Sequence, residues 1–184
     1  MKASTKSFKK FIFISLPFVV LLGLYSATQS ALLDVDEIEV LITGGSKITS
    51  DEVIAASGIL LSQSMISADT NKAESSISMN PWVDEVQVNK EWPNTISIWV
   101  STREAFAYLV TLEGKFSTID VNGIVLTSGK LDPSVDFVTL LVENLVEPGE
   151  RIETAEMLLK AARGVTPDLQ KWIKIISPTA SGVR

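Results

Sequence analysis

The stretch Pro81–Leu109 constrains the fold of this chain more than any other part of its sequence. Val86 and Val88 alternate with polar residues, which is the two-residue period of a half-buried strand. The pattern breaks at residues 90–94, where a proline with a fixed φ is followed by an asparagine that favours a turn. It resumes at once in residues 95–100. The stretch therefore predicts a β-hairpin with one apolar face.

The residue order in this hairpin is also informative. Residues 88–107 read V-x-K-x-W-P-x-T-x-x-I-x-V-x-x-R-x-x-x-A. This resembles the POTRA module of the FtsQ/DivIB bacterial division proteins, whose hairpin commonly reads V-x-R-x-W/F-P-x-T-x-x-I-x-V-x-E-R-x-P-x-A. The chain departs from that pattern at Lys90, Thr102 and Ala105. Lysine keeps the positive charge of the usual arginine but lacks its bidentate fork.

The residues before the hairpin predict one strand and two short helices. Residues 35–42 alternate, with Ile38, Val40 and Ile42 on one face, and two glycines close the strand. Thr49 and Glu52 form a capping box, and Asp69 caps a second helix. The order β-α-α-β-β over residues 34–109 is the POTRA arrangement. If the second hairpin strand is central, Val83–Asn89 lies at a sheet edge.

Residues 110–184 predict a second, partial domain of mixed α/β-sheet type. Strands are expected around Glu113-Gly114, followed by a turn in which Asp120 bonds its own backbone. Helices are expected after Gly149 and from Thr166 to Ile176. In the family, further strands usually follow. The resemblance therefore implies that this domain is truncated here, either as a shortened variant or as a fragment.

The N-terminus predicts a membrane anchor. Phe11–Leu33 carries no charge and would form a helix about 34 Å long, enough to cross a hydrocarbon core of about 30 Å. A cleaved signal peptide is the alternative. Lys9 and Lys10 precede the span and acidic residues follow it. This asymmetry places residues 1–10 in the cytoplasm and the body outside the cell membrane.

Composition excludes several kinds of chemistry. The sequence contains no histidine and no cysteine, so a Ser-His-Asp triad, His- or Cys-ligated metals and a cysteine nucleophile are excluded. All 22 acidic residues follow the first four lysines, and a body this acidic repels phosphate backbones. We expect no cofactor, no metal, no nucleic acid and no small-molecule substrate.

The fold class expected is α+β, with an N-terminal transmembrane helix, a POTRA-like domain and the partial second domain. The resemblance implies a non-enzymatic scaffold at the division septum, which links early and late division proteins and septal wall synthesis. Its candidate partner-binding residues lie on or beside the predicted edge: Val83, Glu85, Gln87, Asn89, Lys90, Trp92, Trp99 and Arg103.

Two other functions remain open from the sequence. One is a POTRA-type chaperone or secretion module, although such modules come in tandem before a β-barrel and no repeat is present. The other is an extracytoplasmic hydrolase with paired carboxylates such as Asp84/Glu85 or Asp34/Asp36. A carboxylate pair in a deep cleft would favour this second function.

Overall fold

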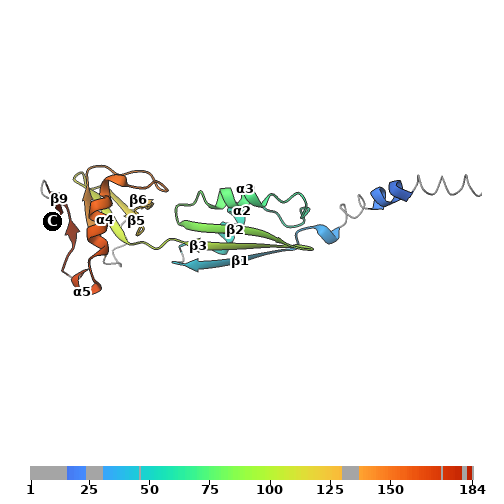
Figure 1. The fold of residues 1–184 in the computed structure, drawn as a ribbon, viewed down its shortest axis with the longest axis horizontal. Coiled ribbons are helices and arrows are strands. Elements are labelled where there is room, and N and C mark those ends of the chain that lie inside the picture. Colours follow the sequence, from blue (N-terminus) through green and yellow to red (C-terminus); the bar gives the residue numbers. More distant parts are fainter. Residues whose placement is uncertain are drawn as a thin grey trace, which may run out of the picture.

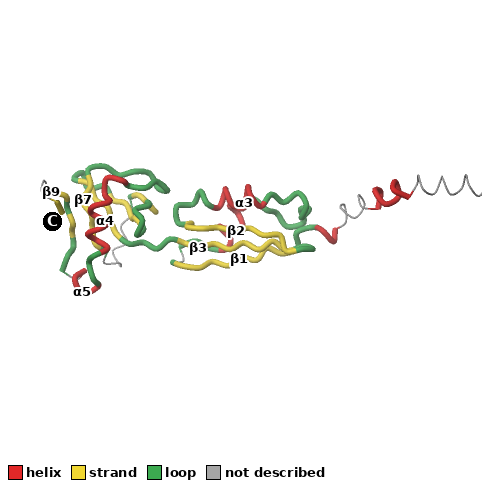
Figure 2. The backbone as a smooth tube through the Cα atoms, viewed as in Figure 1, coloured by secondary structure: helices red, strands yellow, loops and turns green. Residues whose placement is uncertain are grey.

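A computed structural model describes residues 16–23, 31–45, 47–129, 137–170, 172–179 and 182–183. Two sheets follow one another along an elongated molecule, and the N-terminal segment leaves from the end of the first sheet (Figures 1 and 2). The first sheet has three strands and the second has five within the described residues. This arrangement confirms the predicted α+β class.

The first unit has the predicted β-α-α-β-β order. Its elements are β1 (Glu37–Gly44), α2 (Ser50–Ser57), α3 (Thr70–Ile77), β2 (Val83–Glu91) and β3 (Thr95–Thr102). The strand order is β1-β3-β2, with β1 parallel and β2 antiparallel to β3. The hairpin strand β3 is therefore central, which is the condition under which Val83–Asn89 lies at the edge, and β2 is an edge strand. Both helices lie on the same face of the sheet (Figure 1).

Local capping explains where the two helices begin and end. The Thr49 side chain accepts from the Glu52 amide while the Glu52 carboxylate accepts from the Thr49 amide, so the predicted capping box is present. These bonds hold the pKa of Glu52 below its usual value, with the Thr49 backbone amide as the main cause. Gly58, at φ +66°, ends α2 in the left-handed conformation that favours glycine. Asp69 caps α3 through the Lys72 amide.

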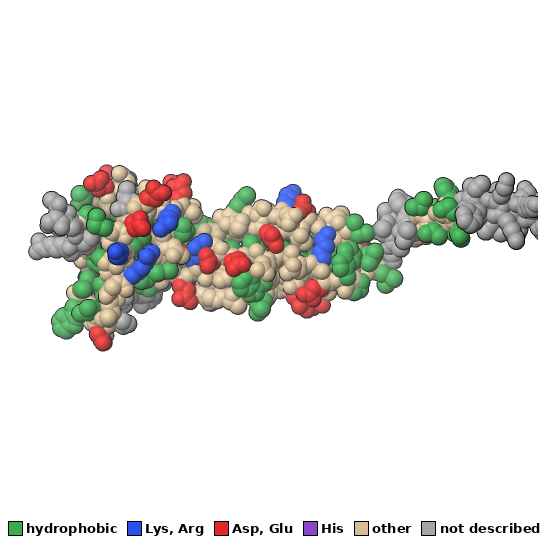
Figure 3. All heavy atoms as spheres, in the orientation of Figure 1, with side chains coloured by type: hydrophobic (Ala, Val, Ile, Leu, Met, Phe, Trp, Pro, Cys, Tyr) green, Lys and Arg blue, Asp and Glu red, His purple; other side chains and the backbone are tan. Residues whose placement is uncertain are grey.

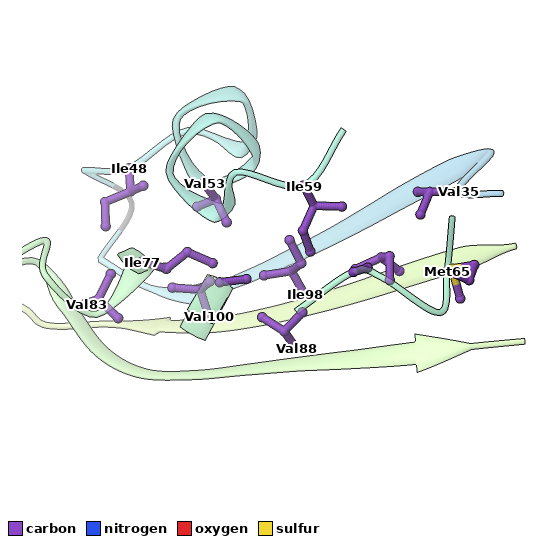
Figure 4. Packing of buried hydrophobic residues seen from close by; sticks show 13 residues of the cluster. Val35, Ile48, Val53, Ile59, Met65, Ile77, Val83, Val88, Ile98 and Val100 are labelled. Carbon is purple, nitrogen blue, oxygen red and sulfur yellow. The ribbon is translucent and has the colours of Figure 1, made fainter. Parts of the chain in front are cut away.

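Period-two alternation in the strands builds the core of this unit. Every second residue of β3 from Ile96 to Val100 is buried, and these side chains face the helices. Val53 of α2 and Ile77 of α3 pack onto them (Figure 4). The alternate residues of β3 lie on the opposite, uncovered face of the sheet. One sheet face is thus a core and the other is open to partners.

The second unit is a five-stranded sheet with a helix packed against it. Its strands are β4 (Ala107–Thr111), β5 (Phe116–Ile119), β6 (Val125–Ser128), β7 (Val138–Val142) and β8 (Ile175–Ile176), in the order β6-β5-β4-β7-β8. The 3₁₀-helix η2 (Glu153–Ala155) and α4 (Glu156–Arg163) bury the predicted apolar stripe in its core. The predicted domain boundary at residues 109 and 110 falls inside β4, and residues 103–106 join the two sheets.

The helix predicted from Thr166 to Ile176 is wrong beyond its first turn. Among the described residues of this stretch, α5 (Pro167–Gln170) alone is helical, and Ile175-Ile176 pairs in parallel with β7 as β8. Trp172, predicted on an apolar helix face, is 84% exposed. Pairing of Ile176 with the buried Leu140 on an open strand edge outcompetes the helical spacing. The chain continues into the hairpin β9 (Pro178–Thr179) and β10 (Gly182–Val183).

Much of the predicted membrane span, Phe11–Leu33, lies outside the described residues. Residues 16–23 are helical, and the 3₁₀-helix η1 covers Ala31–Leu33. None of the helices in the described part of the chain combines the length and the apolar character needed to cross a bilayer.

Candidate docking surface of the first sheet

Strand β2 presents one margin of the first sheet. It pairs with β3 alone, and a register shift between Val83 and Glu85 interrupts that pairing at its start. A strand in this position carries backbone donors and acceptors that its own sheet does not use. The predicted edge Val83–Asn89 is therefore at the sheet margin.

A side chain from α3 occupies the middle of this margin. The amide of Val88 donates to the Glu74 carboxylate over 2.8 Å, so this amide faces away from β3. In an antiparallel pair the backbone groups alternate in direction, which turns the amides of Val86 and Lys90 the same way. Glu74 thus occupies the central one of these three amide donors. A side chain in this position hinders the pairing of a further strand at the edge.

The uncovered face of the sheet carries the polar candidates beside an aromatic side chain. Glu85, Gln87 and Asn89 are exposed, and Gln87 lies opposite Trp99 in the register. Trp99 is half-buried between Gln87 and Leu41 of β1, which is 62% exposed. Trp99 therefore lies away from the helices, as predicted, on a surface flanked by polar and apolar groups.

Three other candidates occupy different environments. Val83 is buried in the core, so only its backbone lies at the margin. The Lys90 ammonium donates to the carbonyl of Ile66 over 3.3 Å. Trp92 is 58% exposed in the β2–β3 turn. Strand β3 runs from this turn to Arg103, so the two side chains lie at opposite ends of β3. Lys9 and Lys10 lie outside the described residues.

Arg103 is used inside the molecule. Its Nη1 lies 2.9 Å from an oxygen of Asp84 and 3.0 Å from Oδ2 of Asp120, so it joins β2 of the first sheet to the β5–β6 turn of the second. Asp120 also accepts from the amides of Asn122 and Ile124, which confirms the predicted turn. No sequence pattern indicated the Arg103 contact, because Arg103 lies in the connection between the two sheets and Asp120 in a turn of the second, 17 positions later.

Two of the carboxylates that suggested hydrolase chemistry contact other side chains. Asp84 contacts Arg103, and Asp36 accepts from the side-chain amide of Asn94 over 2.7 Å. A cleft of about 290 Å³ beside Arg103 is lined by Asp84 and Asp120. Both carboxylates form ion pairs with the Arg103 guanidinium. Within the described residues no cluster of three metal-ligating side chains occurs. The candidate site of the first unit is therefore the β2 edge and the uncovered sheet face beside it.

Comparison with known proteins identifies the first unit. The family model for the POTRA domain, FtsQ-type, matches residues 38–103. The cell division protein FtsQ of Streptomyces venezuelae is 29% identical over 148 residues, which cover 80% of this chain and 53% of the relative. FtsQ of Corynebacterium glutamicum is 33% identical over 92 residues, which cover 50% of this chain and 40% of the relative.

The DivIB branch matches as well. The cell division protein DivIB of Clostridium botulinum is 26% identical over 140 residues, or 76% of this chain and 53% of the relative. The chain thus spans about half the length of these curated relatives, or less. The β-α-α-β-β fold, the hairpin sequence and the matched range agree on one family. Residues 38–103 are a POTRA domain of the FtsQ type, and the chain is similar to the FtsQ and DivIB cell division proteins.

Proposed function

We propose that this chain is a non-enzymatic, single-pass scaffold of the bacterial division machinery. Its extracytoplasmic domains, predicted as residues 34–109 and 110–184, link early and late division proteins and septal wall synthesis by binding other membrane proteins of that machinery. The observation that carries the proposal is the FtsQ-type POTRA domain with β2 at its margin and an uncovered face around Trp99. Edge strands accept a partner strand through main-chain hydrogen bonds.

Anchoring in the cell membrane completes the proposal. The uncharged segment Phe11–Leu33 would cross the bilayer once, with Lys9 and Lys10 on the cytoplasmic side. Confinement in the membrane raises the effective concentration of each partner, so contacts of modest strength suffice for assembly. Binding of this kind needs no reactive side chain.

Val86→Pro tests docking at β2. The Val86 amide faces away from β3, so proline removes a donor from the margin without breaking a bond to β3. We expect the variant to remain folded and to lose enrichment at the division septum, measured with a fluorescent fusion of the full chain. Val86→Thr is the matched control, since it keeps the amide and the β-branched shape. A folded Val86→Pro protein with normal enrichment would exclude this margin as the docking site. A wild-type fusion spread evenly over the envelope would refute the scaffold itself.

Glu74→Ala makes the opposite change to the same margin. Without the carboxylate, the Val88 amide becomes available to a partner strand. Hydrogen bonds to charged groups contribute about 1.5–3 kcal/mol, so hydrogen exchange at Val88 should accelerate by about tenfold or more. We expect septal enrichment equal to or above that of the wild type. Weaker enrichment in a folded variant would mean that Glu74 supports docking and does not compete with it.

A further inference from the structure

Five large apolar side chains are exposed at one end of the POTRA domain. They come from η1, from the loop between α2 and α3, and from the β2–β3 turn, and they form what we name the base patch: Leu32 (78% exposed), Leu60 (67%), Leu61 (61%), Ile66 (50%) and Trp92 (58%). Figure 3 shows hydrophobic side chains gathered at this end, beside the N-terminal segment.

Backbone hydrogen bonds hold the three segments together. The Met65 amide donates to the carbonyl of Leu33 over 2.7 Å, and Val35 exchanges bonds with Gln63 and Ser62 over 2.8 and 2.7 Å. The β2–β3 turn joins the same end, because the amide of Asp36 donates to the carbonyl of Asn94 over 2.8 Å and Lys90 reaches Ile66. The base patch is therefore a built surface.

The core of the domain does not account for the base patch. The same loop buries Ile59, Met65 and Ala68, while Leu60, Leu61 and Ile66 remain outside. The three buried residues close this end of the core, and the three exposed ones are not needed for that. A contiguous exposed apolar patch of this kind marks an interaction surface.

The path of the chain indicates what the base patch contacts. The base patch surrounds the point where the chain passes from the domain into the uncharged segment Phe11–Leu33. Leu33 and Val35 are bonded to the loop, so the end of that segment, which includes Leu32, is fixed against the rest of the patch. A tryptophan at the headgroup level is typical of residues that border a bilayer. With the segment in the bilayer up to Leu33, the base patch would lie at the membrane surface.

We propose that the base patch seats the POTRA domain on the outer surface of the lipid bilayer. This proposal rests on the membrane anchoring proposed above. The contact is apolar, because Asp34, Asp36 and Glu91 surround the patch and Lys90 is its nearest cation. Seating therefore needs no anionic lipid. It would hold the long axis of the domain at a set angle to the membrane, with β2 and Trp99 above the surface.

Site-directed spin labelling tests the seating directly, since the chain contains no native cysteine. The full chain is reconstituted in phosphatidylcholine vesicles with one nitroxide, at Leu61→Cys in the patch or at Leu112→Cys in the second unit. Leu112 is 87% exposed and serves as the matched control. A third label, at Val20→Cys, reports on anchoring alone. Collision rates with oxygen, which enriches in lipid, and with a water-soluble nickel chelate are measured for each label.

We expect the Leu61 label to collide with the nickel chelate several-fold less often than the Leu112 label, and more often with oxygen. Adding anionic lipid should not strengthen the seating, because the neighbouring carboxylates are repelled by a negative surface. A Leu61 label as accessible to nickel as the Leu112 label, with the Val20 label in lipid, overturns the seating and leaves the anchor intact. A Val20 label in water overturns the anchor, and the seating with it.

Discussion

Replacing Arg103 with alanine should lower the free energy of unfolding by about 3 kcal/mol, the lower end of the range for a buried ion pair that loses one partner. The Arg103 side chain is 19% exposed and that of Asp120 is 3% exposed. Without the guanidinium, Oδ2 of Asp120 remains buried without a partner, while Oδ1 keeps the two turn amides. Urea unfolding of the full chain in detergent, followed by tryptophan fluorescence, measures the change.

Two matched variants separate this effect from the loss of a surface charge. Lys115→Ala breaks an ion pair of similar length, 2.9 Å to Glu113, but both of its side chains are largely exposed, so we expect no measurable change. Asp84→Ala removes only the half-exposed partner of Arg103 and should cost far less than Arg103→Ala. Equal losses for Arg103→Ala and Lys115→Ala would mean that the contact between the two sheets adds no stability.

Truncating Ile98 to alanine should lower the free energy of unfolding by about 2–5 kcal/mol, because the substitution leaves a cavity in the middle of the central strand. Ile98 is 1% exposed and belongs to the core that both helices cover (Figure 4). The fold of the POTRA domain depends on that face of β3. The same unfolding measurement applies, and hydrogen exchange should locate the loss in the first unit.

Leu41→Ala is the control for Ile98→Ala. Leu41 lies on the neighbouring strand and on the opposite face, where it pairs in register with Trp99. Since Leu41 is 62% exposed, its truncation should change the stability little while it alters the uncovered face. A large loss of stability for Leu41→Ala would show that this face is packed and so is not free for a partner.

Local patterns predicted most of the first unit. Alternation along residues 95–100 predicted a strand with one buried face, and the capping residues Thr49 and Asp69 predicted where the helices begin. These patterns succeed because period, cap and turn are properties of a few neighbouring residues. The same reasoning failed from residue 172 onward, where a distant strand, β7, decides between helix and strand for Ile175-Ile176.

Residue patterns alone predicted the β-α-α-β-β order and the likeness to FtsQ/DivIB proteins, and they put Val83–Asn89 at the margin on the condition that β3 is central, which the strand order then met. Only the tertiary structure decided that Arg103 joins the two sheets, that Glu74 caps the Val88 amide and that five apolar side chains meet at the base. The physical reason is distance along the chain. The Glu74–Val88 and Arg103–Asp120 contacts join residues 14 and 17 positions apart, and the base patch comes from three separate segments, so no local pattern encodes which of these groups the fold brings together.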